Sequence, residues 1–144
     1  MTSISVDEYK RRLAKRPVKP RRVYDYAEQR EQAQVVLWAR ARFDEDSDKW
    51  HDLDLLHCSL NGVKLSKAQA GKAKSQGMRT GIPDLFLPVP RKGFSGLFIE
   101  MKSETGRLSD AQKDVVPRLS ALGYSMHVAY SGREAIEIIR TYYA

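Results

Sequence analysis

Two carboxylates and an ammonium group stand in or beside two apolar runs of this sequence. In "GIPDLFLPVPRKGFSGLFIEMKS", residues 81–103, Asp84 stands near the start of one apolar run, and Glu100 and Lys102 stand at the end of the next. Residues two apart on a strand share a face and lie about 6.5 to 7 Å apart, so Glu100 and Lys102 point the same way while Met101 points into the core. If the two runs are neighbouring strands, both carboxylates and the lysine meet at the surface of one sheet.

This set of groups suits the metal-dependent hydrolysis of a phosphodiester. Two close carboxylates disfavour their joint ionisation, and a divalent cation removes that penalty. Mg²⁺ fits because it takes oxygen ligands, keeps several waters and often uses only one or two carboxylates. Lys102 would then orient the attacking water or stabilise charge on the phosphate, and the sequence leaves both roles open.

Each motif also has a structural explanation when taken alone. Pro83-Asp84 is a common turn dipeptide. The pair Glu100 and Lys102 could be a weak ion pair on an exposed strand. The combination of both motifs, beside apolar runs of a predicted hairpin in a basic protein, favours the catalytic interpretation.

The elements that must position these groups follow from local signals. Sequences of the form S-x-x-E or S-x-x-Q predict capped helix starts. They begin at Ser5, Ser66, Ser109 and Ser131. Apolar residues at spacings of three and four predict a further helix from about Tyr26 to Phe43.

Strands and turns fill the intervals between these helices. "LDLLHCSLN" predicts a strand that ends at Asn61-Gly62, and "YSMHVAY" predicts another. Arg91 to Gly96 reads as the turn of the hairpin. The order helix, strand, helix, strand, strand, helix, strand, helix predicts an α/β fold, with a mixed central β-sheet flanked by helices.

Charge distribution points to a polyanionic partner. The chain has 144 residues and a net charge of +7. Lys10 to Arg22 contains eight basic residues and no acidic one. Gly62 to Thr80 contains no acidic residue either, and its basic residues are Lys64, Lys67, Lys72, Lys74 and Arg79. Two such patches favour nucleic acid, and the alternative is a solvated, solubilising surface.

Several other classes of function find no support in the sequence. No apolar run approaches the roughly 20 residues that span a bilayer, and the N-terminus lacks a secretory signal. One cysteine, Cys58, excludes an intrachain disulfide, so we expect a cytoplasmic protein with Cys58 as a small buried residue. The residues His51, His57 and His127 do not form a convincing set of zinc ligands.

Together the motifs resemble the PD-(D/E)xK nuclease superfamily and, within it, the virus-type replication–repair nuclease (VRR-NUC) family. The matching segments are "KSQGMRTGIPDLFLPV", "GLFIEMKSETGRLSDAQKDVVPRLSALGY" and "SGREAIEII". The similarity covers about Gln29 to Ile139. It implies a restriction-endonuclease-like core over residues 26–144. The basic helix and arm expected over residues 1–25 have no counterpart in the family pattern.

The resemblance assigns roles to the charged residues of the hairpin. Asp84 and Glu100 would be ligands of Mg²⁺ or Mn²⁺. The main-chain carbonyl of Met101 would be a further ligand. Lys102 would be the catalytic lysine. Met101 replaces a more usual aliphatic residue of the family, but only its carbonyl would be needed.

Two helices would contribute further site residues by the same resemblance. The family uses a glutamate on the N-terminal helix as a metal ligand. Glu31 is our choice for it, and Glu28, one turn earlier, is the competitor; Glu31 could instead be a solvated first-turn glutamate. Gln112 matches a polar family position near the site, and it is also part of the S-x-x-Q helix start, so both roles can hold together.

The function implied by the resemblance is that of a metal-dependent DNA endonuclease. Small stand-alone members resemble Holliday-junction resolvases that act as homodimers, which place two symmetric sites on a four-way junction. The residues expected to contact the DNA backbone are Lys67, Lys72, Lys74 and Arg79, with the basic arm. Two alternatives stay open: a flap, general or restriction-like DNA nuclease, and a non-catalytic DNA-binding module with a nuclease fold.

Overall fold

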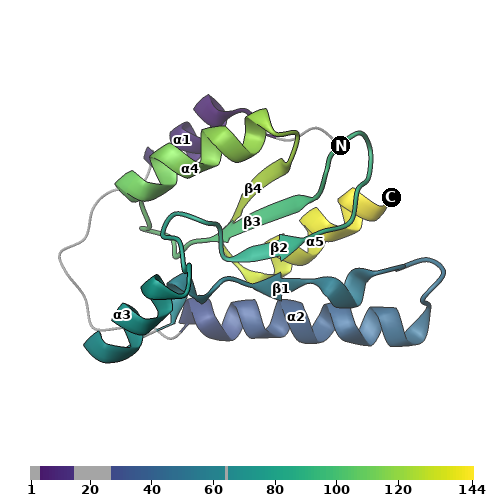
Figure 1. Ribbon diagram of the computed structural model, residues 1–144. Helices are drawn as coiled ribbons and strands as arrows, with labels where there is room; N and C mark the ends of the chain where they lie inside the picture. Colours follow the sequence, from purple (N-terminus) through teal and green to yellow (C-terminus); the bar gives the residue numbers. More distant parts are fainter. Residues whose placement is uncertain (1–3, 15–26, 64) are drawn as a thin grey trace.

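A four-stranded sheet with helices on both faces forms the protein (Figure 1). The computed structural model describes residues 4–14, 27–63 and 65–144. Most of the predicted basic arm, and Lys64, lie outside the described residues. The helices are α1 (Val6–Ala14), α2 (Ala27–Glu45), α3 (Lys67–Ser75), α4 (Asp110–Ala121) and α5 (Gly132–Tyr143). The strands are β1 (His57–Cys58), β2 (Leu85–Leu87), β3 (Leu97–Met101) and β4 (Ser125–Ala129).

The sheet is mixed, as the sequence predicts. Its strand order is β1-β2-β3-β4. The pairs β1–β2 and β2–β3 are antiparallel, and β3–β4 is parallel. Helix α4 joins the two parallel strands, because a parallel connection needs a crossover rather than a tight turn. The expected α/β architecture is therefore confirmed.

The side chains of β3 alternate between two hydrophobic clusters on opposite faces of the sheet. Leu97, Ile99 and Met101 pack in the larger cluster, to which α2 and α5 contribute. Phe98 belongs to the smaller cluster, to which α1, α4 and β4 contribute. Glu100 follows Phe98 by two residues, so its carboxylate points to the side of the smaller cluster. Figure 1 shows α1 and α4 together on that side of the sheet.

The first strand is shorter than predicted, because two 3₁₀ turns replace most of it. The turns are η1 (Leu53–Leu55) and η2 (Leu60–Gly62). Leu53 and Leu56, three residues apart, are both buried, a spacing that matches a 3₁₀ turn rather than a strand. What remains is a two-residue edge strand with both residues exposed. The expectation that Cys58 is buried is therefore wrong.

The serine-capped helix starts are confirmed. Ser66 and Ser109 each accept a hydrogen bond from the backbone N–H three residues on, and the glutamine there accepts one in return. Ser131 caps α5, but the Glu134 carboxylate accepts from the N–H of Tyr130 instead of completing the box. Among the described residues, no helix has the length and apolar character needed to cross a membrane.

Candidate active site

Strands β2 and β3 bring Asp84 and Glu100 together. Leu85 pairs with Ile99 in the antiparallel register, so the preceding Asp84 lies opposite Glu100. The Asp84 carboxylate accepts a hydrogen bond from the N–H of Met101 at 2.8 Å. This hydrogen bond fixes the Asp84 side chain against the backbone of Met101, at the end of β3 and next to Glu100.

Glu100 is a fully buried carboxylate with two polar neighbours. Its side chain is 2% exposed, and the Lys102 ammonium lies 2.6 Å from its Oε1 atom. The side-chain amide of Gln112 donates a hydrogen bond to the same oxygen. Lys102 itself is 16% exposed, and its N–H continues the β3–β4 ladder by donating to the carbonyl of Ala129. The Lys102 residue is thus fixed at its backbone and at the tip of its side chain, and a small part of that side chain is exposed to solvent.

Burial raises the pKa of both carboxyl groups above the ordinary range. For Glu100, burial and then the charge of Asp84 raise the pKa to about 7, and Lys102 and Gln112 oppose this shift. For Asp84, burial raises the pKa, the Met101 N–H and the Lys102 ammonium lower it, and the charge of Glu28 raises it. One lysine therefore does not neutralise this acidic cluster, a situation that favours an additional positive charge.

One oxygen atom shows where such a charge fits. Glu100 Oε2 is buried and has no hydrogen-bond partner among the described residues. A buried carboxylate oxygen without a partner is destabilising. A cation held by Asp84, Glu100 and the carbonyl of Met101 would satisfy it. These donors are all hard oxygen atoms, a set that suits Mg²⁺, which completes its shell with water, rather than Zn²⁺.

The two candidate glutamates of α2 have different partners. The carboxylate of Glu28 accepts the N–H of Ser103, directly after Lys102, and its charge acts on Asp84. The carboxylate of Glu31 accepts the N–H of Gly132 at the start of α5. This geometry favours Glu28 as the acidic residue of α2 at the site, whereas the contact made by Glu31 joins α2 to α5.

Two glycines allow the close approaches on which this arrangement depends. Gly81 has φ of +88°, and a Cβ atom there would lie 2.5 Å from the carbonyl oxygen of Ala111. The loop before Asp84 can therefore contact the first turn of α4, where Gln112 lies. A Cβ atom on Gly132 would lie 2.9 Å from a carboxylate oxygen of Glu31. Larger residues at either position would push apart the elements that carry the site.

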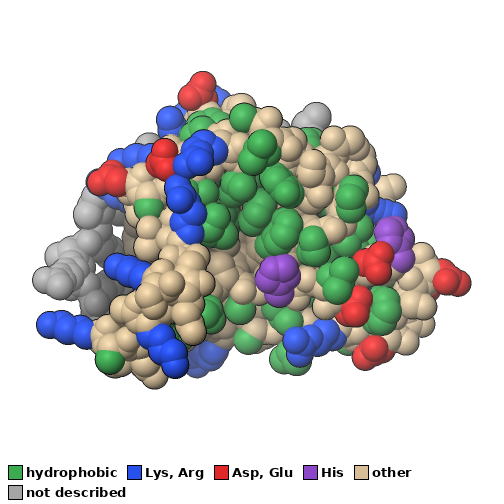
Figure 2. All heavy atoms as spheres, viewed as in Figure 1, with side chains coloured by type: hydrophobic (Ala, Val, Ile, Leu, Met, Phe, Trp, Pro, Cys, Tyr) green, Lys and Arg blue, Asp and Glu red, His purple; other side chains and the backbone are tan. Residues whose placement is uncertain are grey.

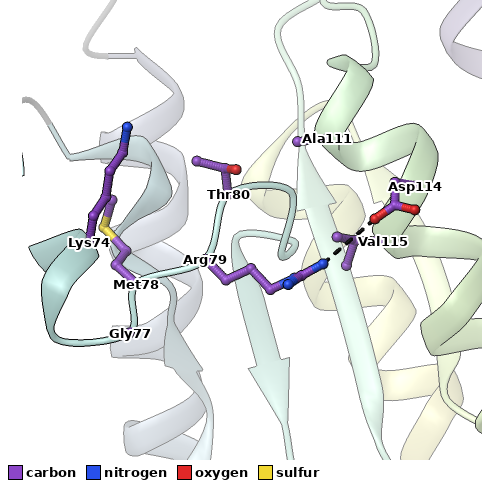
Figure 3. A pocket seen from close by; sticks show the side chains of 8 residues that line it. All are labelled: Lys74, Gly77, Met78, Arg79, Thr80, Ala111, Asp114 and Val115. Carbon is purple, nitrogen blue, oxygen red and sulfur yellow. Dashed lines mark ion pairs between the residues drawn. The ribbon is translucent and has the colours of Figure 1, made fainter.

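A basic groove adjoins this loop. It has a volume of about 570 Å³, and its walls include Lys74, Arg79, Thr80, Ala111 and Asp114. Figure 3 shows the Arg79 side chain reaching from the loop after α3 toward α4, where it forms an ion pair with Asp114 at 3.6 Å. Figure 2 shows lysine and arginine side chains on the left of the molecule, where α3 lies.

The predicted DNA contacts are exposed on this basic side. Lys67, Lys72 and Lys74 are exposed on α3, and in the described part of the chain none of them has an ion-pair partner.

The Asn61 side chain stabilises the loop between α3 and β2, a role that the sequence does not predict. It donates hydrogen bonds to the carbonyls of Arg79 and Ile82 and so fixes the loop between α3 and β2. The Asn-Gly pair was a sign of a turn, but not of this contact.

The three histidines considered from the sequence differ in their surroundings. His51 and His57 are exposed, whereas His127 is buried in β4 and makes a hydrogen bond with Ser125 at 3.0 Å.

Tyr9 of α1 is an unexpected neighbour of the site: its ring is buried, and the charges of Glu100 and Asp84 both act on its hydroxyl. Nothing in the pattern of α1 signals this position, because one tyrosine in a short helix is equally compatible with ordinary packing.

Comparison with known proteins agrees with this geometry. The family model of the VRR-NUC domain matches residues 18–132. A solved structure described as a VRR-NUC domain protein is similar to this chain at 27% sequence identity with a TM-score of 0.63, over 81% of this chain and 87% of that one. Curated proteins give no match. The chain therefore belongs to the VRR-NUC family and carries its nuclease-type domain.

Proposed function

We propose that this protein is a Mg²⁺- or Mn²⁺-dependent endodeoxyribonuclease that hydrolyses phosphodiester bonds in the cytoplasm. The observation that carries the proposal is the pair of carboxylates, half-buried Asp84 and buried Glu100, beside the partly exposed side chain of Lys102. A bound cation would lower the pKa of a coordinated water and offset negative charge on the phosphate. The oxygen atoms of the acidic pair, including the free Glu100 oxygen, would bind this cation, and they need no other role in the reaction.

The residues of the chain would divide the remaining work. Gln112 and Lys102 both contact Glu100 Oε1, which leaves Oε2 available. Hydrolysis joins a water oxygen to phosphorus and breaks one bond from phosphorus to a sugar oxygen; the water loses a proton, and the leaving sugar oxygen takes one up. Negative charge grows on the phosphate oxygens as this happens, and the Lys102 ammonium is placed to stabilise it. Glu28 is our preferred residue on α2 for the acidic position, in place of Glu31.

The basic groove would hold the DNA backbone. Exposed lysines of α3 attract phosphate groups, and their contribution depends strongly on salt. Arg79 already has a carboxylate partner in Asp114, so phosphate would have to replace that exposed ion pair, whose strength in water is small. These contacts position DNA without reading its sequence, which fits recognition of a branched structure.

We further propose that the substrate is a four-way DNA junction and that the protein acts as a homodimer. The support is the resemblance of the motifs to those of small VRR-NUC proteins and the match of the chain to the VRR-NUC domain. Two copies related by a two-fold axis would present two sites to opposite strands.

A cleavage panel tests these proposals. Equal amounts of a four-way junction, a flap and a linear duplex are incubated with the full chain in Mg²⁺, Mn²⁺ or EDTA. We expect symmetric nicks in the junction with either metal and none in EDTA. Lys102→Ala should bind the junction but not cut it. Preferred cutting of linear duplex would contradict junction selectivity, and binding without cutting in both metals would indicate a non-catalytic DNA-binding module.

A further inference from the structure

Helix α1 places a phenol group next to the carboxylates of the site. Tyr9 is 1% exposed and belongs to the same buried cluster as Phe98 of β3 and Val128 of β4. Phe98 precedes Glu100 by two residues on the same face, and Val128 pairs with Glu100 across the parallel strands. Helix α1 packs against α4 and β4, and Figure 1 shows α1 and α4 on the same side of the sheet. The Tyr9 ring, which belongs to the cluster on that side, therefore enters the layer toward which the Glu100 carboxylate points.

The hydroxyl of this tyrosine and the free oxygen of Glu100 are both unsatisfied. Among the described residues, neither the Tyr9 hydroxyl nor Glu100 Oε2 has a hydrogen-bond partner, and both atoms are buried. Burial and then the charges of Glu100 and Asp84 raise the pKa of Tyr9, so the hydroxyl keeps its proton and remains a donor. A donor and an acceptor are therefore buried near one another, each without a partner.

We propose that Tyr9 is a positioning residue for the metal-binding carboxylate: its hydroxyl holds Glu100 Oε2 through one bridging water. This inference rests on the metal-dependent function proposed above. A water between the two groups would satisfy both, as buried waters commonly do. A carboxylate oxygen has a second lone pair, so it can accept this hydrogen bond and still coordinate a cation. Carboxylates that bind metals are regularly oriented by such outer hydrogen bonds.

The position of Tyr9 in the chain makes this contact a feature of the N-terminal helix. Helix α1 spans Val6–Ala14, whereas the VRR-NUC model begins at residue 18. Ser5 caps the helix by accepting the N–H of Glu8 at 3.1 Å, and its carbonyl accepts the N–H of Tyr9 at 2.8 Å. The segment outside the matched domain would thus complete the surroundings of a residue inside it.

The test is calorimetric titration of the full chain with Mn²⁺ in the absence of DNA. Tyr9→Phe removes the hydroxyl and keeps the ring, and we expect it to bind Mn²⁺ about tenfold more weakly than the wild type. Its melting temperature should not fall, because the lost hydroxyl has no direct partner. Tyr142→Phe is the matched control. Its hydroxyl donates to the carbonyl of Val89 at 2.7 Å in the other cluster, so it should melt earlier and bind Mn²⁺ normally.

The outcomes separate the role of Tyr9 from the existence of the metal site. Equal Mn²⁺ affinity of Tyr9→Phe and the wild type would overturn the role of Tyr9 and leave the metal site standing. A wild type that binds no more Mn²⁺ than Glu100→Gln would overturn the metal site itself, and the inference with it. Proton NMR of the wild type gives a second measurement that does not depend on a variant. The Tyr9 hydroxyl resonance should shift when Mg²⁺ is added, and an unchanged resonance would contradict the proposal.

Discussion

The helices α3 and α4 begin with the same sequence motif, yet only one of these starts touches the site. Ser66 and Gln69 form a capping box in which the glutamine oxygen accepts at 2.9 Å, and in Ser109 and Gln112 the corresponding distance is 3.0 Å. The Gln69 side chain is exposed, whereas Gln112 is 8% exposed and its amide donates to Glu100.

The difference shows that a capping box uses only one of the two polar groups of the glutamine side chain. The side-chain oxygen accepts the N–H of the capping serine, and the NH₂ group stays available. On α3 that group faces water, where glutamate would serve as well. On α4 it faces a buried carboxylate, where only a donor is acceptable. The surroundings, and not the motif, turn a structural glutamine into part of a site.

Replacing the side-chain NH₂ group of the capping glutamine by oxygen should have the largest effect, and it should affect α4 far more than α3. Gln112→Glu keeps the cap but places a second carboxylate against Glu100, so we expect about 3 kcal/mol lower unfolding free energy at pH 8 without metal. Cleavage should fall roughly a hundredfold. Gln69→Glu is the matched change and should stay within about 0.5 kcal/mol of the wild type. Denaturant unfolding and junction cleavage measure both; similar losses in the two variants would refute the distinction.

The pH dependence of stability should sharpen the same contrast. The pKa of Glu100 is raised to about 7 in the folded protein, so between the ordinary carboxyl pKa and about 7 the folded state binds the proton more tightly than the unfolded state. Stability then falls as pH rises through this window, by on the order of 2 to 3 kcal/mol in metal-free protein. Glu100→Gln should remove most of this slope, and Mg²⁺ should reduce it. Unfolding in EDTA at pH 5 and pH 8 is the measurement; equal slopes in wild type and variant would rule out this assignment.

The basic surface of α3 should affect DNA binding and leave the metal site unchanged. Replacing Lys67, Lys72 and Lys74 by alanine should weaken junction binding about tenfold at moderate salt, and should reduce the slope of log affinity against log salt by up to about 3. Mn²⁺ binding should match the wild type. Fluorescence anisotropy over a salt series gives the slope. Lys113→Ala, on α4, is a control, because that lysine already pairs with Asp110 at 3.0 Å. An unaltered slope in the triple variant would place the DNA elsewhere.

The smallest effect concerns the two capping serines. Ser66→Ala should lower the unfolding free energy by about 1 kcal/mol, the usual contribution of a cap, with no change in Mn²⁺ binding. Ser109→Ala should lose a similar amount and also bind Mn²⁺ more weakly, because its cap fixes the backbone that carries Gln112. Thermal melts and calorimetry compare the pair, and identical behaviour in the metal titration would weaken the link between the cap and the site.

The sequence predicts most of the fold because its local signals are strong here. Capping serines mark where four helices begin, and the nearly continuous apolar run of Leu97 to Met101 defines a strand buried on both faces. Strand β1 is the main failure. The apolar residues of "LDLLHCSLN" fit a strand or a 3₁₀ turn equally well, and only the packing of Leu53 and Leu56 decides between them.

The sequence likewise predicts some residues of the candidate site and not others. Alternation along a strand places Glu100 and Lys102 on one face, so their meeting follows from the sequence. Glu28 and Glu31 lie three residues apart on the same helical face, and no pattern separates their partners. The burial of Tyr9 depends on how α1 docks, which is a tertiary contact that local propensity does not contain.

The most direct test of the central claim is a crystal structure of the protein soaked in Mn²⁺, with anomalous scattering used to locate the ion. The account predicts a peak within about 2.0 to 2.5 Å of oxygen atoms of both Asp84 and Glu100. The ion should be lost in Glu100→Gln crystals treated in the same way. Strong cleavage activity in Mn²⁺ together with no anomalous peak between these two carboxylates would contradict the account.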